Sequence, residues 1–484
     1  MYSGQELIKF YSKNLRPKRI KSNYRRSSVT KSEKIVQLYQ QDYTDDEIAK
    51  ILYKGEKGQN FRKLKSRMLE QASESILSQI DRVKLRNKYD VSVFTVQKLI
   101  LVSQLLLLKD SRKVAEPLLK KAFRVSSFIQ YTPLIIQSAR YLSYSSAYKG
   151  DINLVKKYTA VINKQLQIYK NELELESDYF ALLTQISNLA EYSDENRRAI
   201  KALLTKAKLI LEKSKSYALQ LLYFRITITY FHSKQDFHSM KIFCRQALSY
   251  LDSNPHLFQN SRAGEFSLYE MDSCLRLKQF SLGTKCANQC SQYFIPYSST
   301  WAVFYEYYFL LAMRTLNFDK AFEIYATLNK SQYKMNKMLQ RQIEKWKIYE
   351  AFLFFVTNEF SDYRQFNLYK YLNDISVFQK DKKGYNFVFL MSKFLLLLNT
   401  DHLDELLNLQ DSFKLYINRY IKAEVYPRHY IFGKFILKYY KRNFFPAKEE
   451  VDYFINELEK HSTLEETEII PYDVLIKMIY ERGK

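Results

Sequence analysis

A short phrase recurs along the chain and constrains its fold more than any other feature. Each copy has a polar break, then an aromatic or aliphatic marker residue, then a stretch with helical periodicity. The markers are Ile152, Phe237, Phe280, Phe318, Phe360, Leu403 and Phe445. The first gap is 85 residues, and the next five are 43, 38, 42, 43 and 42. Weaker copies near Ser111 and Glu195 complete the series, so the sequence predicts roughly eight helical hairpins.

Large aromatic residues occur at a constant sequence distance before the markers. They stand fourteen residues before five successive markers, at Tyr223, Phe266, Phe304, Trp346 and Phe389. The sixth marker departs from the pattern, because Ile431 occupies that place. Fourteen residues make about four helical turns. We therefore expect each aromatic early on the first helix of a hairpin, where it fills the seam between neighbouring hairpins.

The composition favours helices over strands. Glycine and proline together contribute only 17 of the 484 residues, and strands with tight turns use both. The hydrophobic fraction of 46% excludes an intrinsically disordered chain. Stacked hairpins bury a continuous core that no single hairpin can form alone. The predicted fold class is all-α, a solenoid of antiparallel helical hairpins; the alternative is an irregular helical protein with coincidental spacing.

Two segments resemble the tetratricopeptide repeat. One is the phrase NFDKAFEIY at 317–325 with the aromatic-rich stretch before it, and the other is 223–255, which ends on Pro255. The resemblance covers roughly 100–470 and implies a right-handed superhelix over 86–484, with a protein or peptide partner on its surface. The period is longer than the usual length of about 34 residues. Tyr363 and Leu406 also replace the small residue represented by Ala321.

The N-terminal region has a different character. Residues 1–67 hold 17 basic and 7 acidic residues, which is a much higher charge density than in the rest of the chain. We predict a flexible basic arm over 1–34, in which Tyr11 and Tyr24 suit stacking on exposed bases. The candidate nucleic-acid contacts in the arm are Arg16, Lys18, Arg19, Lys21, Arg25 and Arg26. The alternative is a solvated tail.

A small helical domain is predicted over 35–85. Thr44 and Glu47 have the spacing of a capping box that starts a helix. A second helix carries one apolar stripe, made of Phe61, Leu64, Met68 and Ala72. Further candidate nucleic-acid contacts lie off that stripe, at Arg62, Lys63, Lys65 and Arg67. The pair resembles a helix-turn-helix with an unusually long connector; the alternative is an N-terminal cap of the solenoid.

Motifs of common enzymes and metal sites are missing from the sequence. Neither a phosphate-binding glycine loop nor a zinc motif occurs, so no cofactor and no metal is expected. Cys286 and Cys290 stand one helical turn apart, but buried small hydrophobic residues explain them better than metal ligands do. The acidic clusters at 45–47 and 465–466 are interpreted as helix starts or solvated turns. We expect a protein that is not an enzyme.

The net charge of +25 suits RNA, DNA or a ribosome as partner, although a bias of the genome towards lysine explains it equally well. The most apolar runs, at 99–108 and 394–398, are too short to span a bilayer, and no signal peptide is evident. We therefore predict a cytoplasmic protein without membrane insertion. Its expected function is that of a scaffold or adaptor; the alternative is a nucleic-acid-binding regulator or ribosome-associated factor that uses residues 1–80.

Overall fold

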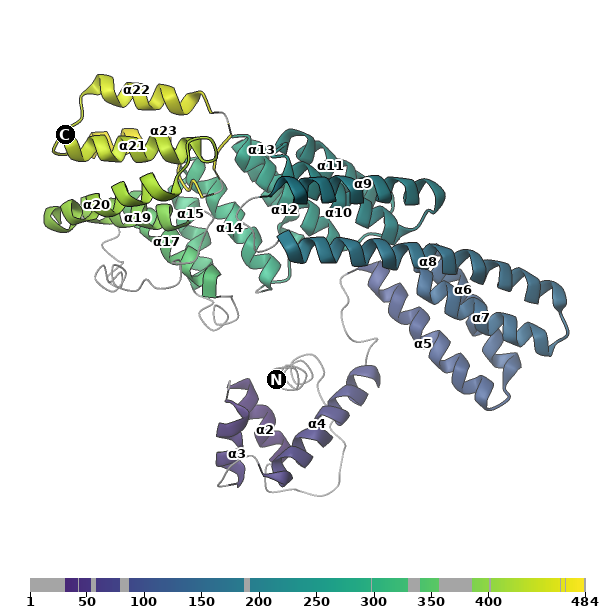
Figure 1. Ribbon diagram of the computed structural model, residues 1–484. Coiled ribbons are helices and arrows are strands. Elements are labelled where there is room, and N and C mark those ends of the chain that lie inside the picture. Colours follow the sequence, from purple (N-terminus) through teal and green to yellow (C-terminus); the bar gives the residue numbers. More distant parts are fainter. Residues whose placement is uncertain are drawn as a thin grey trace. The chain divides into compact units, whose positions relative to one another are not determined.

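The computed structural model describes residues 31–41, 43–53, 58–78, 87–186, 192–296, 298–329, 340–356, 385–399, 402–461, 463–465 and 467–482 (Figure 1). Within these ranges all regular secondary structure is helical, so the prediction of an all-α protein is confirmed. The chain divides into two compact units, residues 1–86 and residues 87–484.

The first unit contains three described helices. They are α2 (Lys31–Gln40), α3 (Asp45–Tyr53) and α4 (Gln59–Ser78). The predicted capping box at the start of α3 is confirmed, because the backbone N–H of Thr44 donates to Glu47 at 2.7 Å and the N–H of Glu47 donates to the Thr44 hydroxyl at 3.4 Å. Phe61 and Met68 of α4 are buried against α2 and α3, as the apolar stripe predicts. The side chain of Ala72 lies outside the described part.

The second unit is a series of helices in which each packs mainly on its neighbours in sequence (Figure 1). In chain order they are α5 (Lys88–Leu108), α6 (Arg112–Phe128), α7 (Thr132–Tyr148), α8 (Ile152–Ile186), α9 (Asp194–Lys213), α10 (Tyr217–Ser233), α11 (Phe237–Ser253), α12 (Asn260–Arg276), α13 (Phe280–Cys290), the 3-10 turn η2 (Ser291–Tyr293), α14 (Ser299–Arg314), α15 (Phe318–Asn329), α17 (Gln340–Val356), α19 (Tyr385–Asn399), α20 (Leu403–Tyr420), α21 (Pro427–Lys441), α22 (Lys448–Glu459) and α23 (Tyr472–Arg482).

One turn geometry recurs between these helices and explains the repeated phrase. The residue two places before the next helix has a positive φ, between 52° and 71°, at Asp110, Gln130, Gly150, Gln235, Lys278 and Leu316. The following backbone N–H then bonds back to a carbonyl five residues earlier, as in the bonds from Asp151 to Ser146 and from Asp236 to Phe231. This is the Schellman closure of a helix C-terminus. It fixes where the next helix begins.

The markers lie where these turns end. Ile152, Phe237, Phe280, Phe318 and Leu403 are each the first residue of a helix. Phe445 lies three residues before α22, and Phe360 is outside the described residues. The sequence phrase therefore predicted the helix starts correctly at these five positions. The reason is local, because the turn and the residue that follows it are encoded within a few neighbouring positions.

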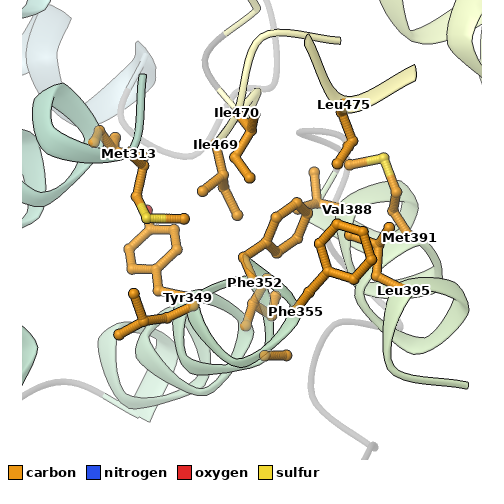
Figure 2. Close-up of a cluster of buried hydrophobic side chains, with 14 of the residues drawn as sticks. Met313, Tyr349, Phe352, Phe355, Val388, Met391, Leu395, Ile469, Ile470 and Leu475 are labelled. Carbon is orange, nitrogen blue, oxygen red and sulfur yellow. The ribbon is translucent and has the colours of Figure 1, made fainter. Parts of the chain in front are cut away.

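The largest core cluster lies in the C-terminal half of this unit, and the last part of the chain contributes to it. Figure 2 shows Ile469, Ile470 and Leu475 facing Phe352 and Val388, which come from α17 and α19. All five side chains are buried. The segment between α22 and α23 thus packs against helices more than seventy residues earlier in the chain. This non-local contact is additional to the packing of neighbouring helices.

Helix α5 is longer than the apolar run at 99–108 that the sequence analysis identified. It spans 21 residues, and an 18-residue window within it has a mean hydropathy of 1.9, so by length and composition it could cross a membrane. The run at 99–108 is too short to span a bilayer, but the complete helix is long enough. One face of α5, however, packs on α6 and α7 through Val96 and Ile100, and Tyr89 at its start contacts Tyr217 of α10.

Candidate functional site

A cavity opens where the first turns of four helices come together in the second unit. Its volume is about 370 Å³, which lies within the range of ligand sites. The first turns of α5, α7, α10 and α12 border it, and one side of α8 closes it. The residues that line it are Tyr89, Gln130, Tyr131, Thr132, Pro133, Tyr169, Glu172, Leu173, Glu176, Tyr217, Ala218, Leu221, Leu222, Arg225, Gln259 and Arg262.

Two tyrosines form part of the cavity wall. The rings of Tyr89 and Tyr217 lie with their centroids 5.3 Å apart, and both side chains are buried. Burial raises the pKa of each phenol above its usual value, so both carry their proton at neutral pH. The hydroxyl of Tyr217 is buried and makes no hydrogen bond with any described residue. It is shielded from water, so a ligand could reach it only if the cavity wall moved.

Two arginines line the side of the cavity formed by α10 and α12. Arg225 donates from Nε to Oε1 of Glu265 at 2.8 Å, and Arg262 donates from Nη1 to Oε2 of the same carboxylate at 3.1 Å. Glu265 thus holds both guanidinium groups in place. The Nε of Arg262 is buried and finds no partner among the described residues. Because a guanidinium presents five donors in a fixed plane, the partly exposed Arg262 side chain offers the cavity donors other than the one that Glu265 accepts.

Carboxylates of α8 also line the cavity. Glu172 is buried and accepts a hydrogen bond from the Thr132 hydroxyl at 2.7 Å. Burial raises the pKa of Glu172, and hydrogen bonds from Ser216 and Thr132 oppose that rise. Glu176 lies one helical turn further along the same face. Acceptors on α8, donors on α10 and α12, and tyrosine rings therefore line the same cavity.

This arrangement suits recognition. The arginine and carboxylate side chains that line the cavity can form charge-assisted hydrogen bonds with a ligand, and these are stronger than hydrogen bonds between neutral groups. Aromatic walls add contact area with few rotatable bonds. The lining residues include neither histidine nor cysteine. The cavity therefore offers hydrogen bonds of both polarities and apolar contact, which match a polypeptide segment that carries polar side chains.

The predicted nucleic-acid contacts fall into two groups. Those of the arm, namely Arg16, Lys18, Arg19, Lys21, Arg25 and Arg26, lie outside the described residues. On α4, Arg62, Lys63 and Arg67 are exposed. Lys65 differs from them, because it is only partly exposed and its ammonium pairs with the Asp45 carboxylate of α3. It contributes to the packing of the first unit.

The five phased aromatics lie on the first helices of successive hairpins, early or near the middle of each. Phe266, Phe304, Trp346 and Phe389 are buried, whereas Tyr223 is partly exposed and its neighbour Phe224 is buried instead. The ring of Phe224 on α10 lies 5.9 Å from that of Phe266 on α12. None of the five lines the cavity. They belong to the core rather than to a binding site.

The sequence analysis did not find the cavity residues. Local signals were present, because Ser216 caps α10 and Pro133 stands in the first turn of α7. These signals mark where single helices begin. That four such starts meet around one space depends on how hairpins far apart in sequence stack, which no local pattern encodes. No family model, curated protein or solved structure matches the chain.

Proposed function

We propose that residues 87–482 form a tetratricopeptide-like solenoid that acts as a non-enzymatic scaffold and holds a segment of a partner protein in the cavity. The observation that carries this proposal is one cavity lined by arginine side chains of α10 and α12, carboxylates of α8 and two buried tyrosines. The consecutive packing of the helices supports the solenoid arrangement. Extended repeat surfaces of this kind commonly bind peptides.

Selection of short random peptides against the full chain tests this proposal. Peptides that bind the wild type are expected to lose affinity by about tenfold or more for Arg262→Gln, since about 1.4 kcal/mol corresponds to a factor of ten. Arg225 keeps its own bond to Glu265 in this variant. Lys201→Gln, at an exposed position on α9, is the matched control. Equal binding by the wild type and Arg262→Gln for every selected peptide would contradict the proposal.

Tyr217→Phe separates binding from folding. The substitution removes a buried hydroxyl that has no partner among the described residues. We therefore expect the free energy of unfolding, measured in urea, to stay the same or to rise by up to about 1 kcal/mol. The same variant should bind the selected peptides as the wild type does, because the hydroxyl is shielded from the cavity. A clear loss of stability would show that the hydroxyl has a structural partner.

A specific feature of the first unit favours nucleic-acid binding as a second candidate function. Lys63 and Arg67 are exposed one turn apart on α4, on the side opposite the buried Phe61 and Met68. The basic arm precedes this helix in the sequence. Lysine and arginine side chains on one helix face are suited to phosphate contacts, and such binding weakens steeply with salt.

A triple substitution tests the second candidate function. The change of Arg62, Lys63 and Arg67 to glutamate should leave the circular dichroism spectrum and melting temperature unchanged, because all three side chains are exposed. Lys65 is kept because it pairs with Asp45. Binding of fluorescent RNA and duplex DNA across a salt series should weaken sharply in the variant. Identical salt-dependent binding by variant and wild type would exclude α4 as the contact surface.

A further inference from the structure

Helix α5 has two apolar faces, and only one of them is buried. The buried face consists of Tyr89, Val96, Ile100 and Ser103, which point into the interior of the second unit, to which α5 belongs. The other face carries large hydrophobic side chains between 39% and 81% exposed, namely Val91, Phe94, Leu101, Val102, Leu105 and Leu108. Scattered exposed leucines are ordinary, but a continuous apolar stripe on a soluble surface marks an interaction site.

The spacing of the exposed face indicates the shape of its partner. Val91, Phe94, Lys98, Leu101, Leu105 and Leu108 follow one another at alternating intervals of three and four residues. These are the a and d positions of a heptad repeat, which form the seam of a helix pair. The stripe runs for about 27 Å at 1.5 Å per residue. We call these six residues the α5 seam.

The charges beside the seam are mainly positive. Lys88, Lys98 and Lys109 are exposed, and Lys88 and Lys109 occupy e positions relative to the seam. The nearest carboxylate on the helix, that of Asp90, accepts a hydrogen bond from the Asn87 side-chain amide at 2.7 Å. Residues at e and g positions set the choice of partner through charge. A partner helix with acidic flanks is therefore complementary to this surface.

We propose that the α5 seam docks one amphipathic helix of another protein, with leucine or isoleucine along its apolar stripe and glutamate or aspartate along its flanks. A second copy of the chain fits less well, because a helix pair centred on the seam would bring two Lys98 side chains together in its middle. A bilayer surface also fits less well, because an a/d stripe is narrow and the opposite face of α5 is packed in the core. The proposal is independent of the cavity, since the seam residues do not line it.

A designed helical peptide is the probe. It has 21 residues, the length of α5, with leucine at a and d positions, glutamate at e and g, and a fluorescent label. The full chain is expected to bind it more tightly as salt is lowered. Leu101→Glu combined with Leu105→Glu should weaken binding by about tenfold or more. Leu209→Glu combined with Leu415→Glu, at exposed leucines of α9 and α20, is the matched control and should bind as the wild type does.

Several results would overturn the proposal. One is the absence of peptide binding by the wild type at about 100 μM, which is weaker than most specific complexes. Another is equal binding of a peptide with lysine in place of glutamate. A lower melting temperature for the seam variant than for the control variant would show that the chain itself covers the seam. Seam-dependent dimerisation in sedimentation, or seam-dependent binding to phosphatidylserine vesicles, would assign the surface to a second copy or a membrane. Arg262→Gln should not affect this assay, so its outcome is separate from that of the cavity.

Discussion

Glu468→Gln is expected to lower the free energy of unfolding by about 3–5 kcal/mol, the range measured when one partner of a buried ion pair is removed. Glu468 and Arg428 have fully buried side chains. The glutamine fills nearly the same space, so no cavity is created. The loss comes from the guanidinium, which remains inside the protein and keeps only the longer 3.3 Å pairing with the Asp473 carboxylate among the described residues. Urea denaturation followed by circular dichroism measures the change.

The geometry explains why the loss should be large. Arg428 donates from Nε to Oε2 of Glu468 at 2.9 Å and from Nη2 to Oε1 at 2.7 Å. Paired parallel bonds of this kind are among the stronger hydrogen bonds in proteins. The same carboxylate accepts from the backbone N–H of Tyr472 at 2.8 Å, which joins it to the start of α23. The substitution therefore disturbs both the ion pair and the anchoring of the C-terminal segment.

Two comparisons make this test decisive. Glu457→Gln affects an exposed pair with Lys460 and should change stability far less, because exposed ion pairs contribute little. Replacement of both Arg428 and Glu468 by leucine should be less harmful than the single change, since the buried guanidinium is removed together with its partner. If the single variant were as stable as the wild type, the buried pair would not hold the C-terminal segment in place.

This segment also shows where the sequence analysis failed. The acidic pair at 465–466 was interpreted as a solvated turn or a helix start. Instead, Glu465 is partly buried, and burial together with the nearby Glu468 carboxylate raises its pKa to about 7. Its backbone carbonyl accepts a hydrogen bond from Arg314 at 3.2 Å. The error arose because the partner arginine lies 151 residues away in the chain, beyond the reach of any local pattern.

The features that the sequence did predict are local ones. The capping box of Thr44 and Glu47 and the helix starts at Phe237, Phe280 and Phe318 depend on residues a few positions apart. The exposed face of α5 is the opposite case. Hydropathy identified an apolar run at 99–108 but could not tell which side chains face the core. That distinction requires knowing that α6 and α7 cover only one side of the helix.

Trp346→Ala is expected to lower the free energy of unfolding by about 3–5 kcal/mol, the usual range for removal of a buried aromatic side chain. Trp346 is 3% exposed on α17. Its ring centroid lies 5.3 Å from that of Phe309 on α14 and 5.2 Å from that of Tyr349. Alanine would leave a space that these rings cannot fill without moving, so both the transfer free energy and the packing contacts are lost.

The Trp346→Ala variant also tests whether an aromatic fourteen residues before a marker packs between helices. Trp301 remains in the variant, so fluorescence can follow unfolding together with circular dichroism. Phe445→Ala, at a side chain that is 68% exposed, is the control and should cost little. A loss for Trp346→Ala below about 1 kcal/mol, well under the expected range, would mean that this aromatic does not join α14 to α17. A loss within the range would identify Trp346 as one of the residues that hold successive hairpins together.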